Sequence, residues 1–238
     1  MTALHHGPRG VRYAGGVSPE PVSIALPSGG SVSGLWLAPG RSGACVVLAH
    51  GAGVGMAHKS MVAIAEGLAE RGIASLRYNF PYMERQSRRV DAPPIAHAAV
   101  RAAAVAAKAL AGGAPLFAGG RSFGARMTSQ AQAKATLDGV RGLVFFAFPL
   151  HPANQGSEER AVHLREVDLP MLFLQGTRDA LAEAERLARV VGQLGPRAEL
   201  AWLEDADHSF HVRAGSGRSD AAVMAEALDR AADWMLSH

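Results

Sequence analysis

Five consecutive residues near the middle of the chain have the types and the spacing of a turn that presents a nucleophile. Residues 120–124 are Gly-Arg-Ser-Phe-Gly, a G-x-S-x-G pattern that directly follows an apolar run over residues 115–119. The two glycines allow a strand-to-helix turn too sharp for side chains, and this turn holds the oxygen of Ser122 above the end of the strand. A neutral hydroxyl is a poor nucleophile at pH 7, so Ser122 needs a base from elsewhere in the chain.

Two residues further along the chain supply that base and a group to orient it. Asp179 follows a predicted strand over residues 169–175, and His208 follows another over residues 198–203. Open α/β sheets place their chemistry at the carboxyl ends of the strands, where both residues fall. His208 would accept the proton of Ser122, while Asp179 would fix the imidazole tautomer and stabilise its positive charge. We therefore expect Ser122, Asp179 and His208 to form a catalytic triad.

The elements that must position these residues alternate between strands and helices. Two short alternating runs, residues 21–26 and 31–38, predict an antiparallel hairpin. The strand–helix repeats after it predict an α/β fold with a doubly wound, mostly parallel sheet of about eight strands. The other strands are predicted over residues 44–49, 73–77, 115–119, 140–147, 169–175 and 198–203, and the helices over residues 59–71, 95–110, 123–135, 181–191 and 221–236. We expect a flexible N-terminal segment, residues 1–19, and a single domain over residues 20–238.

The composition excludes several classes of protein. At 238 residues, 48% of them hydrophobic, the chain can bury the core of one α/β domain. The formal net charge is only +3, and the basic residues are scattered apart from Arg85, Arg88 and Arg89, so no nucleic-acid partner is expected. The single cysteine, Cys45, excludes a disulfide framework and fits a reducing cytosol. Residues 1–20 contain no apolar segment, so we expect a cytoplasmic protein with neither a secretion signal nor a membrane partner.

From about Pro21 to the C-terminus the chain resembles an α/β hydrolase of the dienelactone-hydrolase-like branch, and the order serine, acid, histidine is the order of that superfamily. More narrowly, it is similar to a small group of predicted α/β hydrolases whose domain also occurs in a subunit of a eukaryotic histone-acetyltransferase complex. The segments that carry this narrower likeness are Arg-Tyr-Asn-Phe-Pro-Tyr (77–82), Gly-Gly-Arg-Ser-Phe-Gly-Ala-Arg (119–126), Phe-Pro-Leu-His-Pro (148–152) and Gln-Gly-Thr-Arg-Asp (175–179). Dienelactone hydrolases use a cysteine nucleophile, whereas this chain has serine at that position.

The strand over residues 44–49 ends in a glycine-rich turn, residues 50–56, which resembles the oxyanion loop of this superfamily. The resemblance implies that the backbone N–H groups of Ala52 and Phe123 bind the oxygen of the tetrahedral intermediate, with His50 as a structural residue of the turn. A nucleotide site is the alternative for such a turn. It is disfavoured because the Lys-Ser/Thr of a P-loop and the G-x-G-x-x-G spacing are both absent from the sequence.

The substrate pocket should form from loops at the carboxyl ends of the strands. The candidate lining residues are Tyr78, Tyr82, Met83, His151 and Phe210. The alternative is that the tyrosines cap the core and that His151 only binds a backbone carbonyl. Arg121 should pack beneath the serine turn against an acidic or carbonyl partner. The cluster of Arg85, Arg88 and Arg89 forms either a solvated loop or a contact for an acidic substrate.

Together these residues predict a serine hydrolase of the carboxylesterase type that cleaves a small carboxylic ester or thioester through an acyl-enzyme. No metal or organic cofactor is expected, because the triad and backbone amides supply the base and the oxyanion donors. Residues 148–169 leave room for one short helix and no cap domain, so large substrates and peptides are disfavoured. The alternative is a non-catalytic α/β-hydrolase fold used as a protein-interaction module, although a scaffold has no use for a strained serine turn.

Overall fold

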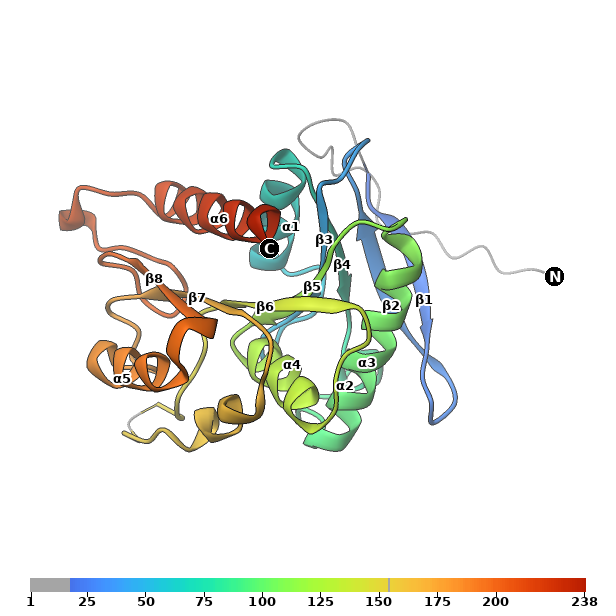
Figure 1. The fold of residues 1–238 in the computed structure, drawn as a ribbon, viewed down its shortest axis with the longest axis horizontal. Coiled ribbons are helices and arrows are strands. Elements are labelled where there is room, and N and C mark those ends of the chain that lie inside the picture. The colour runs from blue at the N-terminus through green and yellow to red at the C-terminus, as the bar shows by residue number, and fades with distance from the viewer. Residues whose placement is uncertain (1–17, 154) are drawn as a thin grey trace.

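In a computed structural model that describes residues 18–153 and 155–238, the chain forms one eight-stranded sheet with helices on both faces (Figure 1). The strands are β1 (Glu20–Ala25), β2 (Ser31–Leu37), β3 (Ala44–Ala49), β4 (Ile73–Tyr78), β5 (Leu116–Arg121), β6 (Val140–Phe146), β7 (Met171–Gly176) and β8 (Ala198–Leu203). The sheet order is β1-β2-β4-β3-β5-β6-β7-β8, in which the β1–β2 and β2–β4 pairs are antiparallel and the other pairs are parallel. The predicted α/β fold, with a mostly parallel sheet and an N-terminal antiparallel hairpin, is confirmed.

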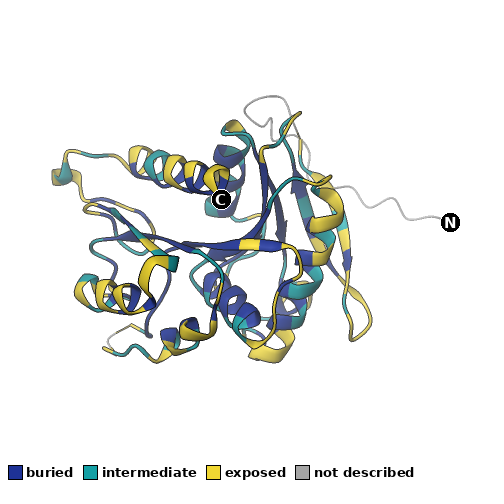
Figure 2. Ribbon diagram, in the orientation of Figure 1, coloured by how far each residue is buried: buried dark blue, intermediate teal, exposed yellow. Residues whose placement is uncertain are grey.

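Helices cover both faces of the sheet because its central strands are apolar on both sides. The helices on one face are α1 (Lys59–Glu70) and α6 (Asp220–Ser237), and those on the other are α3 (Pro93–Leu110), α4 (Phe123–Lys134) and α5 (Ala184–Leu194) (Figure 1). The short helices are α2 (Pro81–Glu84), η1 (Glu159–Glu166), η2 (Gly195–Arg197) and η3 (Ala214–Ser216). Strands β3 and β4 are buried along their whole length, so the sheet separates two hydrophobic cores (Figure 2).

Most elements begin and end within a few residues of their predicted limits, and the differences have local causes. The proline-bearing segment over residues 78–94, for which we predict neither a strand nor a helix, contains α2, which is four residues long and begins at Pro81. A helix this short shows no hydrophobic period in the sequence. Helix α3 begins two residues earlier than expected, because proline is tolerated in the first turn of a helix. Helix α5 begins only at Ala184, since the residues before it belong to the turn after β7.

Two further predictions concern the limits of the domain. Of the predicted flexible segment, residues 1–17 lie outside the described residues, and the sheet begins with β1 at Glu20. Between β6 and β7, the described residues form only a loop and η1, as the short spacing predicts. The carboxyl ends of the strands, where the candidate site lies, are therefore not covered by a cap domain in the described part of the chain.

Candidate active site

Ser122 lies at the turn between β5 and α4 in a backbone conformation that side chains rarely adopt. Its φ of 52° and ψ of −112° fall outside the ordinary regions. The turn is tight because its glycines touch the end of β3. A Cβ atom added to Gly120 or Gly124 would lie within 3.0 Å of backbone atoms of Ala49, so only glycine fits at either position. As the N-cap of α4, Ser122 lies at the positive end of the helix dipole.

Hydrogen bonds join Ser122, His208 and Asp179 in one series. The distance between Ser122 Oγ and His208 Nε2 is 2.8 Å, and that between His208 Nδ1 and Asp179 Oδ2 is 2.7 Å. A carboxylate can only accept a hydrogen bond, so Nδ1 carries the proton and Nε2 accepts from the serine hydroxyl. In this arrangement the imidazole can act as a general base towards the serine. The tertiary structure thus brings together the three residues that the sequence singles out.

Asp179 forms hydrogen bonds with other groups besides His208. Its side chain is fully buried, and Oδ2 also accepts from Gln175 Nε2 at 2.5 Å, while Oδ1 accepts from the backbone N–H of Leu181 at 2.8 Å. Gln175 Oε1 accepts in turn from the N–H of Phe148 at 2.9 Å. A buried carboxylate is stabilised only when such donors surround it. The predicted site omits Gln175, whose only sequence signal is an amide within an otherwise apolar strand.

Arg121 fixes the loop that carries His208. Its Nη2 donates to the backbone oxygen of His208 at 3.0 Å, and its Nη1 donates to Ser60 Oγ at 3.1 Å. Burial lowers the pKa of Arg121, against the opposite effect of the nearby Asp207 and Asp179 carboxylates. Of the predicted acidic or carbonyl partners of Arg121, the carbonyl partner is confirmed.

His50, which follows β3, binds two backbone groups and is not available as a base. Its Nδ1 lies 2.8 Å from the carbonyl oxygen of Gly51, which can only accept, and its Nε2 accepts from the N–H of Phe80 at 3.1 Å. Burial lowers the pKa of His50 to about 4, so the ring is neutral at pH 7. The predicted structural role of His50 is therefore confirmed.

The turn after His50 lies against the serine turn. A Cβ atom on Gly51 would lie 3.9 Å from the Cβ of Ser122, and Ala52 comes directly after this contact. On the other side of the serine, Phe123 is the first residue of α4, where backbone N–H groups have no partner within the helix. These positions suit the two predicted oxyanion donors, and their assignment remains a prediction.

Three of the five residues predicted to line a pocket are core residues in the structure. Tyr78 and Phe210 are 0% and 2% exposed and belong to the two cores on opposite faces of the sheet. Tyr82 is also fully buried, and its hydroxyl donates to the backbone oxygen of Gly51 at 3.4 Å. Large rings at strand ends fill the space beneath the connecting loops, so the alternative of tyrosines that cap the core describes the structure. Phe210 anchors the loop that carries His208.

The remaining predicted loop residues lie at different depths, and His151 is only 1% exposed. Met83 is partly buried against the core, and His151 borders a pocket between α4 and η1. Arg85 forms an ion pair of 2.5 Å with a buried aspartate, whereas Arg88 and Arg89 are exposed. Of the two alternatives for this arginine cluster, the solvated loop therefore describes most of it.

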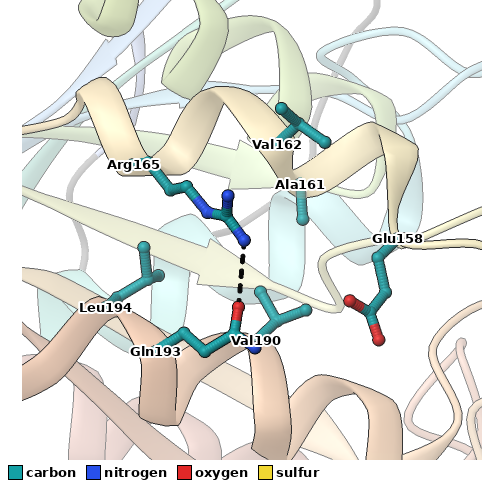
Figure 3. A pocket seen from close by; sticks show the side chains of 7 residues that line it. All are labelled: Glu158, Ala161, Val162, Arg165, Val190, Gln193 and Leu194. Carbon is teal, nitrogen blue, oxygen red and sulfur yellow. Dashed lines mark hydrogen bonds between the residues drawn. The ribbon is translucent and has the colours of Figure 1, made fainter.

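A pocket between η1 and α5 is too small for a substrate. Its volume is about 40 Å³, close to that of one water molecule, and a hydrogen bond of 3.1 Å from Arg165 to Gln193 closes one side (Figure 3). Within the described residues, no group of three or more His, Cys, Asp or Glu side chains could hold a metal ion. None of the helices in this part of the chain is long and apolar enough to cross a membrane.

The family of the chain follows from a match over most of its length. Residues 42–236 match the family described as alpha/beta hydrolase domain. The chain belongs to this family. In this α/β hydrolase the serine follows β5, the acid follows β7 and the histidine follows β8, which is the order of the superfamily. The narrower likeness to a histone-acetyltransferase complex subunit stays a prediction.

Solved structures of bacterial proteins share the fold. An alpha-beta serine hydrolase homologue from Coxiella burnetii is 20% identical with a TM-score of 0.68, and the match covers 92% of this chain and 96% of that one. Dienelactone hydrolase from Anabaena variabilis is 18% identical with a TM-score of 0.71, covering 93% and 98%. A member of the a/b serine hydrolases without lid from Xanthomonas campestris is 20% identical with a TM-score of 0.69, covering 91% and 95%. At these identities the likeness shows the fold alone.

Proposed function

We propose that this α/β hydrolase is a serine hydrolase of the carboxylesterase type, which cleaves a small carboxylic ester or thioester through an acyl-enzyme. The observation that carries the proposal is the hydrogen-bonded series Ser122–His208–Asp179, with distances of 2.8 and 2.7 Å, at a strained turn. Such backbone strain costs about 1–3 kcal/mol and persists where function requires it, whereas an interaction module has no need for it. Two similar structures named above are described as serine hydrolases, which supports the reaction class.

In the first half of the proposed reaction, His208 Nε2 accepts the hydroxyl proton as Ser122 Oγ bonds to the carbonyl carbon of the ester. The carbonyl oxygen becomes an oxyanion, for which the N–H groups of Ala52 and Phe123 are the proposed donors. The bond from this carbon to the leaving oxygen or sulfur then breaks, and the leaving group takes the proton from His208. The acyl group remains on Ser122.

In the second half, a water molecule repeats these steps on the acyl-enzyme. His208 accepts a proton from water as the water oxygen bonds to the acyl carbon, and the proton returns to Ser122 Oγ when the carboxylic acid leaves. Asp179 stabilises the imidazolium form of His208 in both halves. The chain itself supplies the base, the nucleophile and the oxyanion donors, so the proposed mechanism uses no metal or organic cofactor.

A small-molecule ester as the partner and the cytoplasm as the location belong to the same proposal. Cys45 is buried in β3 with a free thiol, and burial raises its pKa to about 12. A protonated, buried thiol neither forms a disulfide nor competes with Ser122 as a nucleophile. The lack of a disulfide fits a reducing compartment.

Labelling with a fluorophosphonate tests the proposal, because this probe reacts with activated serines. The wild-type protein should be labelled and should hydrolyse p-nitrophenyl acetate, and Ser122→Ala should abolish labelling and lower kcat/KM at least about 10³-fold. Ser129→Ala is the matched control. Ser129 is buried on the same helix and lies 2.8 Å from His163 Nε2, and its loss should leave labelling intact. Folded wild-type protein that is neither labelled nor active on esters would overturn the proposal in favour of the interaction module.

A further inference from the structure

The pocket that His151 borders is polar and lies between α4 and the loop that joins β6 to η1. Its volume is about 320 Å³, which is large enough for a small organic group. The residues that line it are Arg126, Gln130, Leu150, His151, Pro152, Gln155, Ser157, Glu159 and Arg160. Two of them are arginines on different elements, Arg126 on α4 and Arg160 on η1, and both are partly buried.

Neither arginine has a carboxylate partner among the described residues. The Nε of Arg126 is buried without a hydrogen-bond partner, and the guanidinium lies 5.7 Å from the centre of the Phe123 ring. Both arginines line the same pocket, and the positive charge of Arg160 adds to the effect of burial in lowering the pKa of Arg126. Exposed arginines of this protein do find carboxylates, as Arg189 and Arg230 do at 3.2 and 3.1 Å. Two partly buried cations side by side are unfavourable unless an anion joins them.

The other charged groups around the pocket leave it positive. His151 places Nδ1 at 2.8 Å from the backbone oxygen of Pro152 and Nε2 at 2.5 Å from Glu183 Oε2. Glu183 is therefore engaged by His151 and pairs with neither arginine of the pocket. Glu159, on the exposed rim, offsets only one of the two arginines.

Backbone hydrogen bonds connect two walls of the pocket to the segments that carry Ser122 and Asp179. The N–H of Arg126 donates to the backbone oxygen of Ser122 at 3.1 Å, so this arginine lies one helical turn, about 6 Å, along α4 from the nucleophile. On the other wall, the N–H of Leu150 donates to the backbone oxygen of Leu181 at 2.8 Å. The N–H of Leu181 donates to Asp179 Oδ1 at 2.8 Å. A spacing of about 6 Å along α4 corresponds to the length of a chain of a few carbon atoms.

We propose that this pocket binds the carboxylate of an anionic ester substrate, with Arg126 and Arg160 as the residues that recognise it. The proposal rests on the serine hydrolase function proposed above and narrows its substrate class to esters that carry an acidic group. Guanidinium groups suit this task because their N–H groups match the geometry of a carboxylate. Binding would also remove the repulsion between the two cations.

The test compares esters that differ by one charge. The anionic esters are mono-p-nitrophenyl adipate, with its carboxylate on the acyl side, and 4-acetoxybenzoate, with its carboxylate on the leaving group. The neutral partner of each is its methyl ester. For each pair we measure the ratio of kcat/KM for the anionic ester to kcat/KM for the neutral ester. For at least one pair, this ratio should fall about tenfold in Arg126→Gln and in Arg160→Gln, because each variant loses hydrogen bonds to a charged group. Because each ratio is compared with that of the wild type, the intrinsic reactivity of the esters cancels.

Two control variants separate the pocket from general charge effects. Arg141→Gln removes an exposed arginine on β6 and should keep the wild-type ratio. Glu159→Gln removes the negative charge at the rim of the pocket and should raise the ratio. Thermal unfolding shows whether each variant is folded, and a ratio of two substrates on one preparation does not depend on the folded fraction.

The two proposals fail in different ways. If fluorophosphonate labels the wild type and both neutral esters are hydrolysed, but Arg126→Gln and Arg160→Gln leave both ratios unchanged, the anion pocket is overturned and the serine hydrolase stands. A folded wild type without labelling overturns both. A fall in the adipate ratio places the acidic group on the acyl side, and a fall in the acetoxybenzoate ratio places it on the leaving group; either supports the pocket.

Discussion

The carbonyl oxygen of Ala49, at the end of β3, occupies the space where a side chain of Gly124 would begin. A Cβ atom on Gly124 would lie within 3.0 Å of this oxygen, closer than real Cβ atoms approach a backbone. The first turn of α4 therefore packs directly on the strand end that leads into the turn over residues 50–56. This contact sets the separation between Ser122 and the proposed oxyanion donors, which a reaction at one carbon atom requires.

Replacing Gly124 by alanine should force α4 away from β3. We expect Gly124→Ala to lower the free energy of unfolding by about 1–3 kcal/mol, as in other overpacked sites, and to slow fluorophosphonate labelling at least about tenfold. Gly192→Ala in α5 is the matched control, because nothing lies within 4 Å of its added Cβ, and alanine should stabilise that helix by about 0.5–1 kcal/mol. Urea unfolding and labelling rates measure both effects. Equal behaviour of the two variants would contradict the tight contact at Ala49.

The variant Asp179→Asn should test the role of Asp179 in orienting His208 while leaving the nucleophile Ser122 in place. Asparagine keeps the shape of the side chain but can donate to His208 Nδ1, which favours the tautomer whose Nε2 carries the proton and cannot accept from Ser122. We expect kcat to fall by about 10³ to 10⁴-fold with little change in KM. Steady-state kinetics with p-nitrophenyl acetate measure this effect. Asp205→Asn, an exposed position after β8, should retain activity, and near-normal activity of Asp179→Asn would remove this residue from the triad.

Two buried histidines should make stability depend on pH. Burial lowers the pKa of His50 and of His163 from 6.5 to about 4 in each case. Between pH 6.5 and about 4 the unfolded chain binds protons that the folded chain does not, so the free energy of unfolding falls as the pH falls, by up to about 3 kcal/mol per histidine. The contribution of exposed His211 to the free energy of unfolding changes with pH in the opposite direction. Its hydrogen bond to Asp220 raises its pKa, so its contribution is present below pH 6.5 and is lost as the pH rises through the folded value.

Urea unfolding at neutral and acidic pH distinguishes these histidines. His163→Gln should have a shallower loss of stability on acidification than the wild type, because one proton-binding group of the unfolded chain has been removed. His211→Gln should have a steeper loss, since a contribution that persists at low pH is gone. A pH dependence unchanged in His163→Gln would contradict a buried, neutral imidazole at that position.

The lack of a cap in the described structure should limit the preferred acyl chain. Each buried CH₂ of a substrate contributes up to about 0.8 kcal/mol, but only where apolar wall is available to contact it. The value of kcat/KM should therefore rise over the first few carbons from p-nitrophenyl acetate and then level or fall towards palmitate. Assays with and without micelles should agree. Preference for the longest chain, or activation by micelles, would indicate a lipid-binding surface.

The sequence by itself determined the elements of this protein and the chemistry at the strand ends. The strands over residues 44–49 and 198–203 have the limits that we predict, because buried parallel strands are continuous apolar runs bounded by turn residues. Ser122, Asp179 and His208 could be found for the same reason. A residue type at a strand end is local information, and the parallel topology then brings strand ends to one edge of the sheet.

Only the tertiary structure decided how deep each neighbouring side chain lies and which partners it meets. Tyr78 and Phe210 lie at or after strand ends, just as pocket residues would, yet both are buried in the hydrophobic cores on the two faces of the sheet. The amide of Gln175, which donates to Asp179, is in turn bound by the N–H of Phe148, a residue 27 positions away in the sequence. Burial and partner choice depend on the packing of segments far apart in the chain, and hydrophobic periods and turn residues carry no information about that packing.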